Sequence, residues 1–298
     1  MAKPLFNIRS IVLLLSVAVW LYAIAPHDAG GKTPKGTLII SGAAGASRES
    51  YGAGVLERFV SLAGGPDANY VYIPTASSGI KLDNGFIYTP PDADVPAENT
   101  KAFEAELAKM FGVTHITILH TRNRQIANSQ SFVEVLRKAN GVWISGGNSG
   151  RLADAYLGTR TEKEIKAVLE RGGVVAGNSA GAIIQGSFIV RGRPDKPVLM
   201  ASGHTRGFGL LENVVINPHL ITANRETELI NVIDAHPELL GIGIDEQTAI
   251  VVEGHQFEVL GDSKIAIYDN QKHDNRWYYW LMPGTVFDLS TRTVVKRR

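Results

Sequence analysis

The sequence has no cysteine among its 298 residues. Disulfides, thiolate metal sites and cysteine nucleophiles are therefore excluded, so a nucleophile must come from another side chain. An H-E-x-x-H pattern, a P-loop lysine and a G-x-G-x-x-G turn after the first predicted strand are also missing. We therefore expect no metal, no nucleotide and no other cofactor.

An excess of charge of one sign is lacking as well. The chain has 30 Lys and Arg against 29 Asp and Glu, and its formal net charge is +1. Proteins that bind nucleic acids carry a basic surface, so we expect no nucleic-acid partner. A hydrophobic content of 44% and a charged content of 20% are ordinary for a globular enzyme.

Residues 1–25 differ from the rest of the chain. Basic residues precede an apolar run, which ends in the small-residue segment AIA at 23–25. This pattern predicts a signal peptide and hence a secreted or periplasmic protein. Pro26 is unfavourable directly after a cleavage site, so a retained N-terminal anchor is the alternative. In that case the membrane would be contacted only through this segment.

Residues 26–36 are polar and contain Gly and Pro, which predicts a linker to a single α/β domain over 37–298. In the first part of this domain, apolar β-branched runs alternate with helical patterns, which predicts a mainly parallel, doubly wound sheet with helices on both faces. A proline-containing stretch at about 79–99 is predicted to be irregular. The predicted strands here are 37–40, 70–73, 116–119, 141–144 and 172–176, and the predicted helices include 55–62, 101–110 and two that begin with capping boxes at 131–134 and 161–164.

The C-terminal part has a different pattern of apolar runs. Its short apolar runs are separated by Gly or Asn/Asp turns, which predicts antiparallel hairpins that close the sheet edge. These runs are 248–252, 257–260, 264–268 and 286–289.

The domain is organised around a turn at residues 177–181, with the sequence GNSAG. A strand, a sharp turn and a helix, with Ser179 at the apex, are typical of a nucleophile elbow. We expect the flanking glycines to let the backbone bend without a Cβ clash. The N–H of Ala180 and that of Gly147, in a small-residue loop, would form the oxyanion hole. The alternative is that G-x-S-x-G arose by chance in a glycine-rich loop.

A serine hydroxyl needs a base to accept its proton. Among the eight histidines, His219 ends a predicted strand, so we expect it at the same sheet edge as Ser179. The acid that orients the histidine is left open by the residues alone. Asp195 lies in a predicted turn between the two and is our first choice, and Glu212 and Asp245 are the alternatives.

Five motifs are spread over about 37–269: IPTAS at 73–77, SGGN at 145–148, GNSAGA at 177–182, VINPH at 215–219 and LGIGIDE at 240–246. Together they resemble the cyanophycinases and the related aspartyl dipeptidases, a family of serine peptidases. The resemblance implies a flavodoxin-like sheet of the class-I amidotransferase type, with Ser179 as nucleophile and His219 as base. It also implies a Glu or Asp at or next to Asp195 as the acid, and a peptide substrate with an aspartyl or β-aspartyl (isoaspartyl) linkage.

The substrate-contacting positions depart from the family's pattern. Ser149 stands where the family has Gln, Asn217 and Pro218 replace Asp-Gln, and Arg225 alone remains of several arginines. The resemblance assigns substrate binding to Asn148 and to these polar positions. Because lost hydrogen bonds change specificity by several kcal/mol, we expect a peptidase for aspartyl or isoaspartyl peptides, with cyanophycin as one candidate substrate.

Two other interpretations stay open. An α/β-hydrolase esterase would use Ser179, Asp245 and His273, which occur in the chain order of that fold. His273 lies in a polar, turn-rich stretch, which disfavours this reading. The second is a non-catalytic exported binding domain on the same scaffold. The sequence also leaves a homodimer open.

Overall fold

A computed structural model describes residues 35–91, 99–190 and 203–296. The predicted leader over 1–25, most of the linker and Asp195 lie outside the described residues. Thr33–Arg298 forms one compact unit. Among the described helices, none combines the length and the apolarity that a membrane crossing requires.

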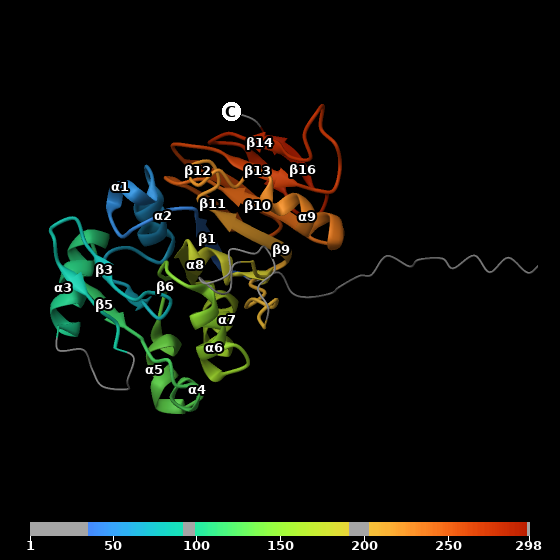
Figure 1. Ribbon diagram of the computed structural model, residues 1–298. Coiled ribbons are helices and arrows are strands. Elements are labelled where there is room, and N and C mark those ends of the chain that lie inside the picture. Colours follow the sequence, from blue (N-terminus) through green and yellow to red (C-terminus); the bar gives the residue numbers. More distant parts are fainter. Residues whose placement is uncertain (1–34, 92–98, 191–202, 297–298) are drawn as a thin grey trace, which may run out of the picture. The chain divides into compact units, whose positions relative to one another are not determined.

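Within the described residues, a nine-stranded sheet runs in the order β16-β15-β12-β11-β1-β7-β6-β2-β5 (Figure 1). Strands β1, β7, β6, β2 and β5 are parallel, and β11, β12, β15 and β16 extend the sheet in antiparallel fashion beyond β1. The bounds are Thr37–Ser41 (β1), Asn69–Ile73 (β2), His115–Ile118 (β5), Gly141–Ile144 (β6), Val174–Asn178 (β7), Thr248–Glu253 (β11), Gln256–Gly261 (β12), Val286–Asp288 (β15) and Thr293–Lys296 (β16).

A second sheet of five described strands has the order β14-β13-β10-β9-β8. Its strands are Gly186–Phe188 (β8), Leu211–Pro218 (β9), Leu240–Ile244 (β10), Ile265–Tyr268 (β13) and Tyr279–Leu281 (β14). Strands β8, β9 and β10 are parallel, whereas β13 and β14 are antiparallel. The parallel core and the antiparallel C-terminal strands confirm the predicted α/β class. The strands that precede Ser179 and His219 nevertheless lie in different sheets, and not at one sheet edge as predicted.

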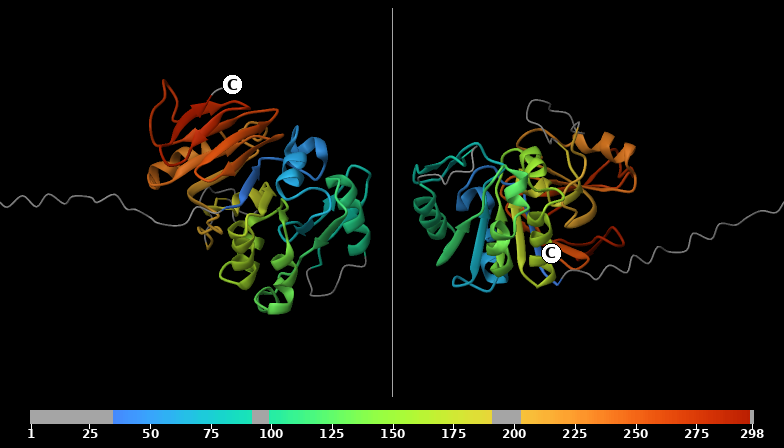
Figure 2. Two further views of the ribbon diagram at one scale, coloured as in Figure 1. Left: turned by 180° about the vertical axis from the view of Figure 1, so that it is seen from behind. Right: turned by 90° about the horizontal axis from the view of Figure 1, so that it is seen from below.

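Helices cover both faces of the parallel strands (Figure 2). Because successive side chains of a strand point to opposite faces, each strand contributes to two cores. On β2, Val71 and Ile73 join one buried cluster, and Tyr70 and Tyr72 join the other. The first cluster includes residues of α4 (Arg124–Ala127), α5 (Gln130–Lys138), α6 (Ser149–Tyr156), α7 (Arg160–Glu170) and α8 (Ala180–Ile183); the second includes residues of α1 (Arg48–Tyr51), α2 (Val55–Leu62) and α3 (Thr100–Phe111).

The second sheet shares the first of these cores. Ile242 and Ile244 of β10 lie in the same buried cluster as Ile250 of β11. The opposite face of this sheet is covered by α9 (Glu228–Ala235). A Cβ at Gly42 would lie 2.1 Å from the carbonyl oxygen of Asp245. Glycine therefore lets the end of β1 approach the segment that follows β10.

A small hairpin occupies the stretch that was predicted to be irregular. It consists of β3 (Ile80–Lys81) and β4 (Ile87–Tyr88). Phe86 and Tyr88 stack on Phe103 of α3, with ring centroids 6.0 and 4.3 Å apart. An isolated bridge between Ala46 and Leu82 ties the hairpin to the loop after β1. These contacts fix the hairpin beside the nine-stranded sheet.

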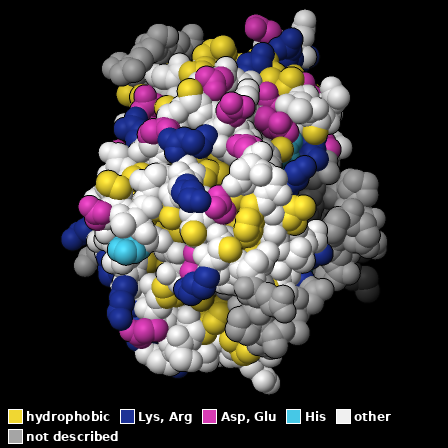
Figure 3. Space-filling view, turned by 90° about the vertical axis from the view of Figure 1, so that its left-hand side faces the viewer, with side chains coloured by type: hydrophobic (Ala, Val, Ile, Leu, Met, Phe, Trp, Pro, Cys, Tyr) yellow, Lys and Arg dark blue, Asp and Glu magenta, His cyan; other side chains and the backbone are white. Residues whose placement is uncertain are grey.

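Charges of both signs lie close together on the described surface. Figure 3 shows acidic and basic side chains interspersed on one face, with small hydrophobic areas among them. Exposed pairs such as Arg48–Glu57 contribute about 0–1 kcal/mol each. The stability of the fold therefore comes mainly from its buried clusters.

Candidate active site

Ser179 lies at a sharp turn between β7 and α8. Its φ of 51° is in the left-handed region, which is strained for a residue with a side chain. Its N–H donates to the carbonyl of Ser41 over 3.1 Å, and its own carbonyl accepts from the N–H groups of Ala182 and Ile183 over 3.0 and 2.9 Å. Hydrogen bonds on both sides therefore hold this backbone conformation.

The flanking glycines are needed for close backbone approach. A Cβ at Gly177 would lie 2.6 Å from the carbonyl oxygen of Gly181, and a Cβ at Gly181 would lie 2.0 Å from that of Ile144. Neither glycine has a positive φ. The flanking glycines therefore avoid a Cβ clash at the turn, as expected, while Ser179 itself takes the left-handed conformation.

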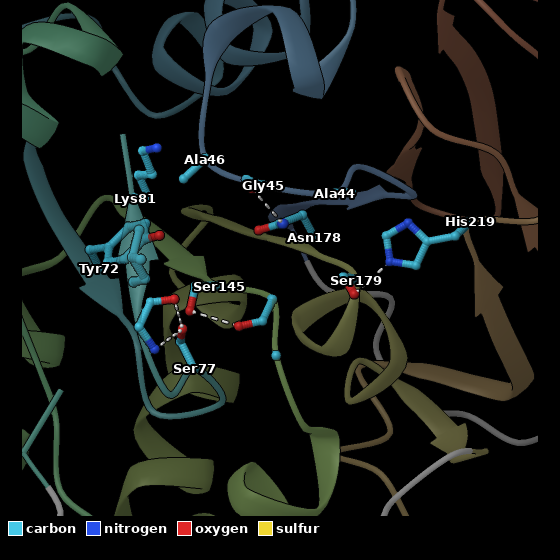
Figure 4. Close-up of a pocket in the computed structure, with 14 residues that line it drawn as sticks. Ala44, Gly45, Ala46, Tyr72, Ser77, Lys81, Ser145, Asn178, Ser179 and His219 are labelled. Carbon is cyan, nitrogen blue, oxygen red and sulfur yellow. Dashed lines mark hydrogen bonds between the residues drawn. The ribbon is translucent and has the colours of Figure 1, made fainter. Parts of the chain in front are cut away.

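His219 follows β9, and its side chain contacts that of Ser179. Its Nε2 is 2.7 Å from the Oγ of Ser179 (Figure 4). The His219 side chain is 15% exposed, so the ring is largely shielded from water. Its φ of 58° is again left-handed, and its carbonyl accepts from the N–H of Ala223 over 3.0 Å. The two side chains are thus in contact although their strands belong to different sheets.

Glu246 is the carboxylate beside the other ring nitrogen of His219. Its Oε1 lies 3.2 Å from Nδ1. It follows β10, which pairs in parallel with β9 so that Ile244 is opposite Pro218. Burial raises the pKa of Glu246, the charge of Asp245 raises it further, and Arg225 opposes both effects.

Asp245 holds the turn that carries His219. Its Oδ1 accepts from the N–H groups of Ile221 and Thr222 over 2.9 and 3.1 Å, and its Oδ2 accepts from the hydroxyl of Ser263 over 2.8 Å. Burial alone would raise the pKa of Asp245, but these hydrogen bonds outweigh it and lower the pKa. Asp245 is therefore a positioning residue for the His219 turn.

Within the described structure, the carboxylate paired with the His219 ring is Glu246, and not the described candidates Glu212 and Asp245. Asp195 lies outside the described residues, so its role stays a prediction. Glu212 is near the start of β9, about 20 Å along the strand from its other end. Sequence reasoning missed Glu246, although it closes the motif at 240–246. The sequence signal that could have found Glu246 is a pair of successive strands, of which the first ends just before His219 and the second just before Glu246. Strands paired in parallel place these two ends side by side.

The two residues predicted to form the oxyanion hole, Ala180 and Gly147, lie in segments next to Ser179. Ala180 is the first residue of α8, and Gly147 has a φ of 135° in the loop after β6. A Cβ at Gly146 would lie 3.1 Å from the Cβ of Ser179, so this loop packs directly on Ser179. Among the described residues, neither the Ala180 nor the Gly147 N–H pairs with a backbone carbonyl. Both groups remain available to an oxyanion.

A cavity of about 300 Å³ opens beside Ser179 and His219. It extends past Ser145 and Tyr72 to Lys81 (Figure 4). The volume is at the lower end of the range of about 300–1,000 Å³ typical of small-ligand sites. It can therefore accommodate a small ligand next to Ser179.

The side chain of Asn178 supports one wall of this cavity. Its Nδ2 donates to the carbonyls of Ala43 and Gly45 over 3.2 and 3.3 Å, and its Oδ1 accepts from Nε1 of Trp143 over 3.2 Å. Asn178 therefore couples the loop after β1 to the strand that carries Ser179.

The four residues assigned to substrate binding do not line the cavity. Asn148 caps α6 by accepting from the N–H of Gly150 over 2.9 Å, and Ser149 is buried. Asn217 is fully buried and donates to Glu228 over 3.1 Å. Arg225 donates to the carbonyl of Pro218 over 3.0 Å. Because these side chains are buried or hydrogen-bonded to other parts of the protein, the structure does not support the predicted substrate contacts.

The alternative triad of an esterase is not assembled. The Nε2 of His273 lies 2.9 Å from the Oδ1 of Asp269, and its ring packs on Tyr279. His273 does not line the cavity at Ser179. His219 occupies the position that this triad would require for His273.

Comparisons with known proteins show which family and which known structure the chain resembles. Residues 38–260 match the model of peptidase family S51. The chain is 30% identical to a cyanophycinase of Nostoc sp. over 289 residues, which cover 89% of this chain and 90% of the relative. It is 27% identical to a cyanophycinase of Geminocystis herdmanii over 231 residues, with 76% and 79% covered. The crystal structure of a peptidase from an acI-B1 actinobacterium aligns with a TM-score of 0.60 at 25% identity, covering 86% of this chain and 98% of that one.

We predict that Asp245→Asn destabilises the protein in a pH-dependent way. The pKa of Asp245 is lower in the folded state than its value of about 3.9 in an unfolded chain. Its carboxylate therefore contributes stability above about pH 4, and this contribution is lost as pH falls through the folded pKa. Urea unfolding between pH 3 and 6 should show a gap between wild type and variant that narrows toward low pH.

Asp274→Asn is the matched control, because Asp274 is exposed and its left-handed backbone, with a φ of 52°, suits Asn. Its unfolding free energy should follow that of the wild type at every pH. A gap for Asp245→Asn that stays constant with pH would contradict the role of the ionised carboxylate.

Proposed function

The chain belongs to peptidase family S51 and is therefore a serine-type hydrolase, and we propose that it cleaves aspartyl or β-aspartyl peptide bonds through a triad of Ser179, His219 and Glu246. The observation that carries this proposal is the distance of 2.7 Å between the Oγ of Ser179 and the Nε2 of His219. This is the arrangement in which an imidazole accepts the proton of an attacking hydroxyl.

In the proposed reaction, Oγ attacks the scissile carbonyl carbon while Nε2 of His219 accepts the hydroxyl proton. The N–H groups of Gly147 and Ala180 stabilise the negative oxygen of the tetrahedral intermediate. His219 then gives the proton to the leaving amine, and the C–N bond breaks. Water attacks the acyl-enzyme by the same route and releases the acid. Glu246 orients the ring through Nδ1 and stabilises the imidazolium.

The substrate class rests on the relatives. The proteins from Nostoc sp. and Geminocystis herdmanii are cyanophycinases. The identity to these relatives is only 27–30%. In addition, Ser149 and Asn217 are buried, and Arg225 is bonded to a backbone carbonyl. We therefore do not assign the polymer substrate of the relatives to this chain. A small aspartyl or isoaspartyl peptide is the substrate that we favour, with cyanophycin as a candidate.

We also propose that residues 1–25 direct export, on the basis of their basic, apolar and small-residue segments. The first residue of the protein recovered from the periplasm or the medium tests this. A chain that begins just after Ala25 supports cleavage, and an uncleaved chain in the membrane fraction supports the anchor. Cytosolic protein that still carries the leader would contradict export.

Ser179→Ala should abolish hydrolysis of α- and β-aspartyl dipeptides while the protein stays folded. Loss of the nucleophile typically lowers kcat by a factor on the order of 10⁶. Product release should be measured by chromatography, and the fold by circular dichroism. Ser61→Ala, at an exposed position of α2, is the control and should retain full activity. Turnover of any of these peptides by Ser179→Ala at more than a few per cent of the wild-type rate would contradict the mechanism.

Glu246→Gln should lower kcat by about a hundredfold to ten-thousandfold with little change in KM, because the ring loses the charge that stabilises its imidazolium. The pKa of Glu246 is raised above the ordinary value of 4.5. Its carboxylate is therefore protonated at a higher pH than usual, and the protonated form has no charge to stabilise the imidazolium. Wild-type activity should therefore fall with decreasing pH already above pH 4.5. Initial rates against pH measure both effects.

Glu238→Gln is the control, because Glu238 Oε1 lies 3.4 Å from Nδ1 of His236, in a second histidine–carboxylate pair that does not line the cavity. It should leave kcat and the pH profile unchanged. A Glu246→Gln enzyme with at least half of the wild-type kcat would show that another group orients His219.

A further inference from the structure

We propose that Lys81 is a specificity-determining residue that binds the free carboxylate of the aspartyl residue whose carbonyl Ser179 attacks. In an α-aspartyl peptide this is the side-chain carboxylate, and in a β-aspartyl peptide it is the α-carboxylate. The inference rests on the proposed function and adds to it the group that would distinguish an acidic acyl residue from a neutral one.

The charge of the cavity is one basis for this inference. Among its described lining residues, Lys81 and His219 are the only ones that can carry a positive charge, and none is a carboxylate. Within the described structure Lys81 forms no ion pair, although Asp83 follows two positions later. The ammonium group of Lys81 therefore gives the cavity a positive charge that no lining carboxylate compensates.

The placement of Lys81 is the second basis. Figure 4 shows Ser179 and His219 at one end of the cavity and Lys81 at the other, with Ala44, Gly45 and Ala46 along one wall. A substrate with its carbonyl at Ser179 would extend along this wall toward Lys81. The flexible stem of lysine can then carry its compact charge to the substrate carboxylate.

The hairpin gives Lys81 a defined position. Lys81 ends β3 and pairs with Ile87 of β4, and the next residue, Leu82, forms the bridge to Ala46. The buried side chain of Ile80 anchors the same strand, and Tyr88 stacks on α3. The backbone at Lys81 is therefore fixed, and only its side chain has to adjust to a ligand.

Hydroxyl groups in the same part of the cavity are already used. The Oγ of Ser77 donates to the carbonyl of Gly79 over 2.8 Å and accepts from its N–H over 3.1 Å. The hydroxyl of Tyr72 is buried in contact with Ser145 and Tyr51. These groups are less available to a carboxylate, which leaves Lys81 as the main donor at this end of the cavity.

Binding measurements separate recognition from catalysis. We would titrate β-aspartyl-alanine, and its analogue with an α-carboxamide, into full-length Ser179→Ala protein by calorimetry. The acid should bind at least about tenfold more tightly than the amide, because hydrogen bonds to charged groups are the stronger ones. Adding Lys81→Met should remove this preference, and adding Lys81→Arg should retain most of it. Raising the salt concentration should weaken the preference only where the positive charge is present.

Lys163→Met is the matched control, because Lys163 is also exposed but lies on α7, outside the cavity lining. It should keep the full preference for the acid. With the nucleophile intact, Lys81→Met should lower kcat/KM for the acid at least about tenfold and leave that for the amide unchanged.

The outcomes distinguish this inference from the proposed function. Equal binding of acid and amide to Ser179→Ala, or a preference that survives Lys81→Met, would overturn the role of Lys81. Hydrolysis of the acid by the wild type would still support the proposed function in that case. Lys81-dependent binding of the acid without any hydrolysis by the wild type would support Lys81 and overturn the proposed function.

Discussion

The hydrogen bond between Ser179 and His219 is the interaction on which the rest of the structure depends. Its two partners follow β7 and β9, which lie in different sheets, so the bond forms only if the two sheets are held in register. The absence of a side chain at Gly42 allows the end of β1 to approach the segment after β10. Asp245, in that segment, then fixes the turn that carries the histidine. The contact between Ser179 and His219 thus depends on the packing of two sheets as well as on the local motif.

In the proposed mechanism, the adjacent carboxylates Asp245 and Glu246 have different roles because their surroundings differ. Hydrogen bonds from the turn after His219 and from Ser263 keep Asp245 ionised, whereas burial and the charge of Asp245 itself raise the pKa of Glu246. Arg225 limits that rise while it donates to the carbonyl before the histidine. A change at Asp245 should therefore alter both the position of the His219 ring and the ionisation of Glu246. Environment assigns such roles to neighbouring acids in other enzymes as well.

Strands and helices with clear periodicity could be predicted from the sequence, as for the helix at 55–62, which matches α2. A capping box at 131–134 was predicted, but α5 begins earlier because the side chain of Ser129 accepts from the N–H of Phe132 over 3.3 Å. Periodicity reports which faces of a strand are buried and not which sheet it joins, so the second sheet was not foreseen. Strand ends indicated Ser179 and His219 as candidates, and the structure brings their side chains into contact. The pairing of β9 with β10, which places Glu246 beside His219, and the shape of the cavity depend on contacts between distant segments, which no local pattern encodes.

The central claim is that His219 makes Ser179 a nucleophile, and the rate at which a fluorophosphonate labels the protein tests it most directly. Mass spectrometry identifies the labelled residue, and the rate is followed against pH in the wild type and in His219→Ala. The account predicts labelling of Ser179 alone, with a rate that rises as one group loses its proton and falls by orders of magnitude in the variant. Labelling at another serine, or an equal rate in both proteins, would contradict it.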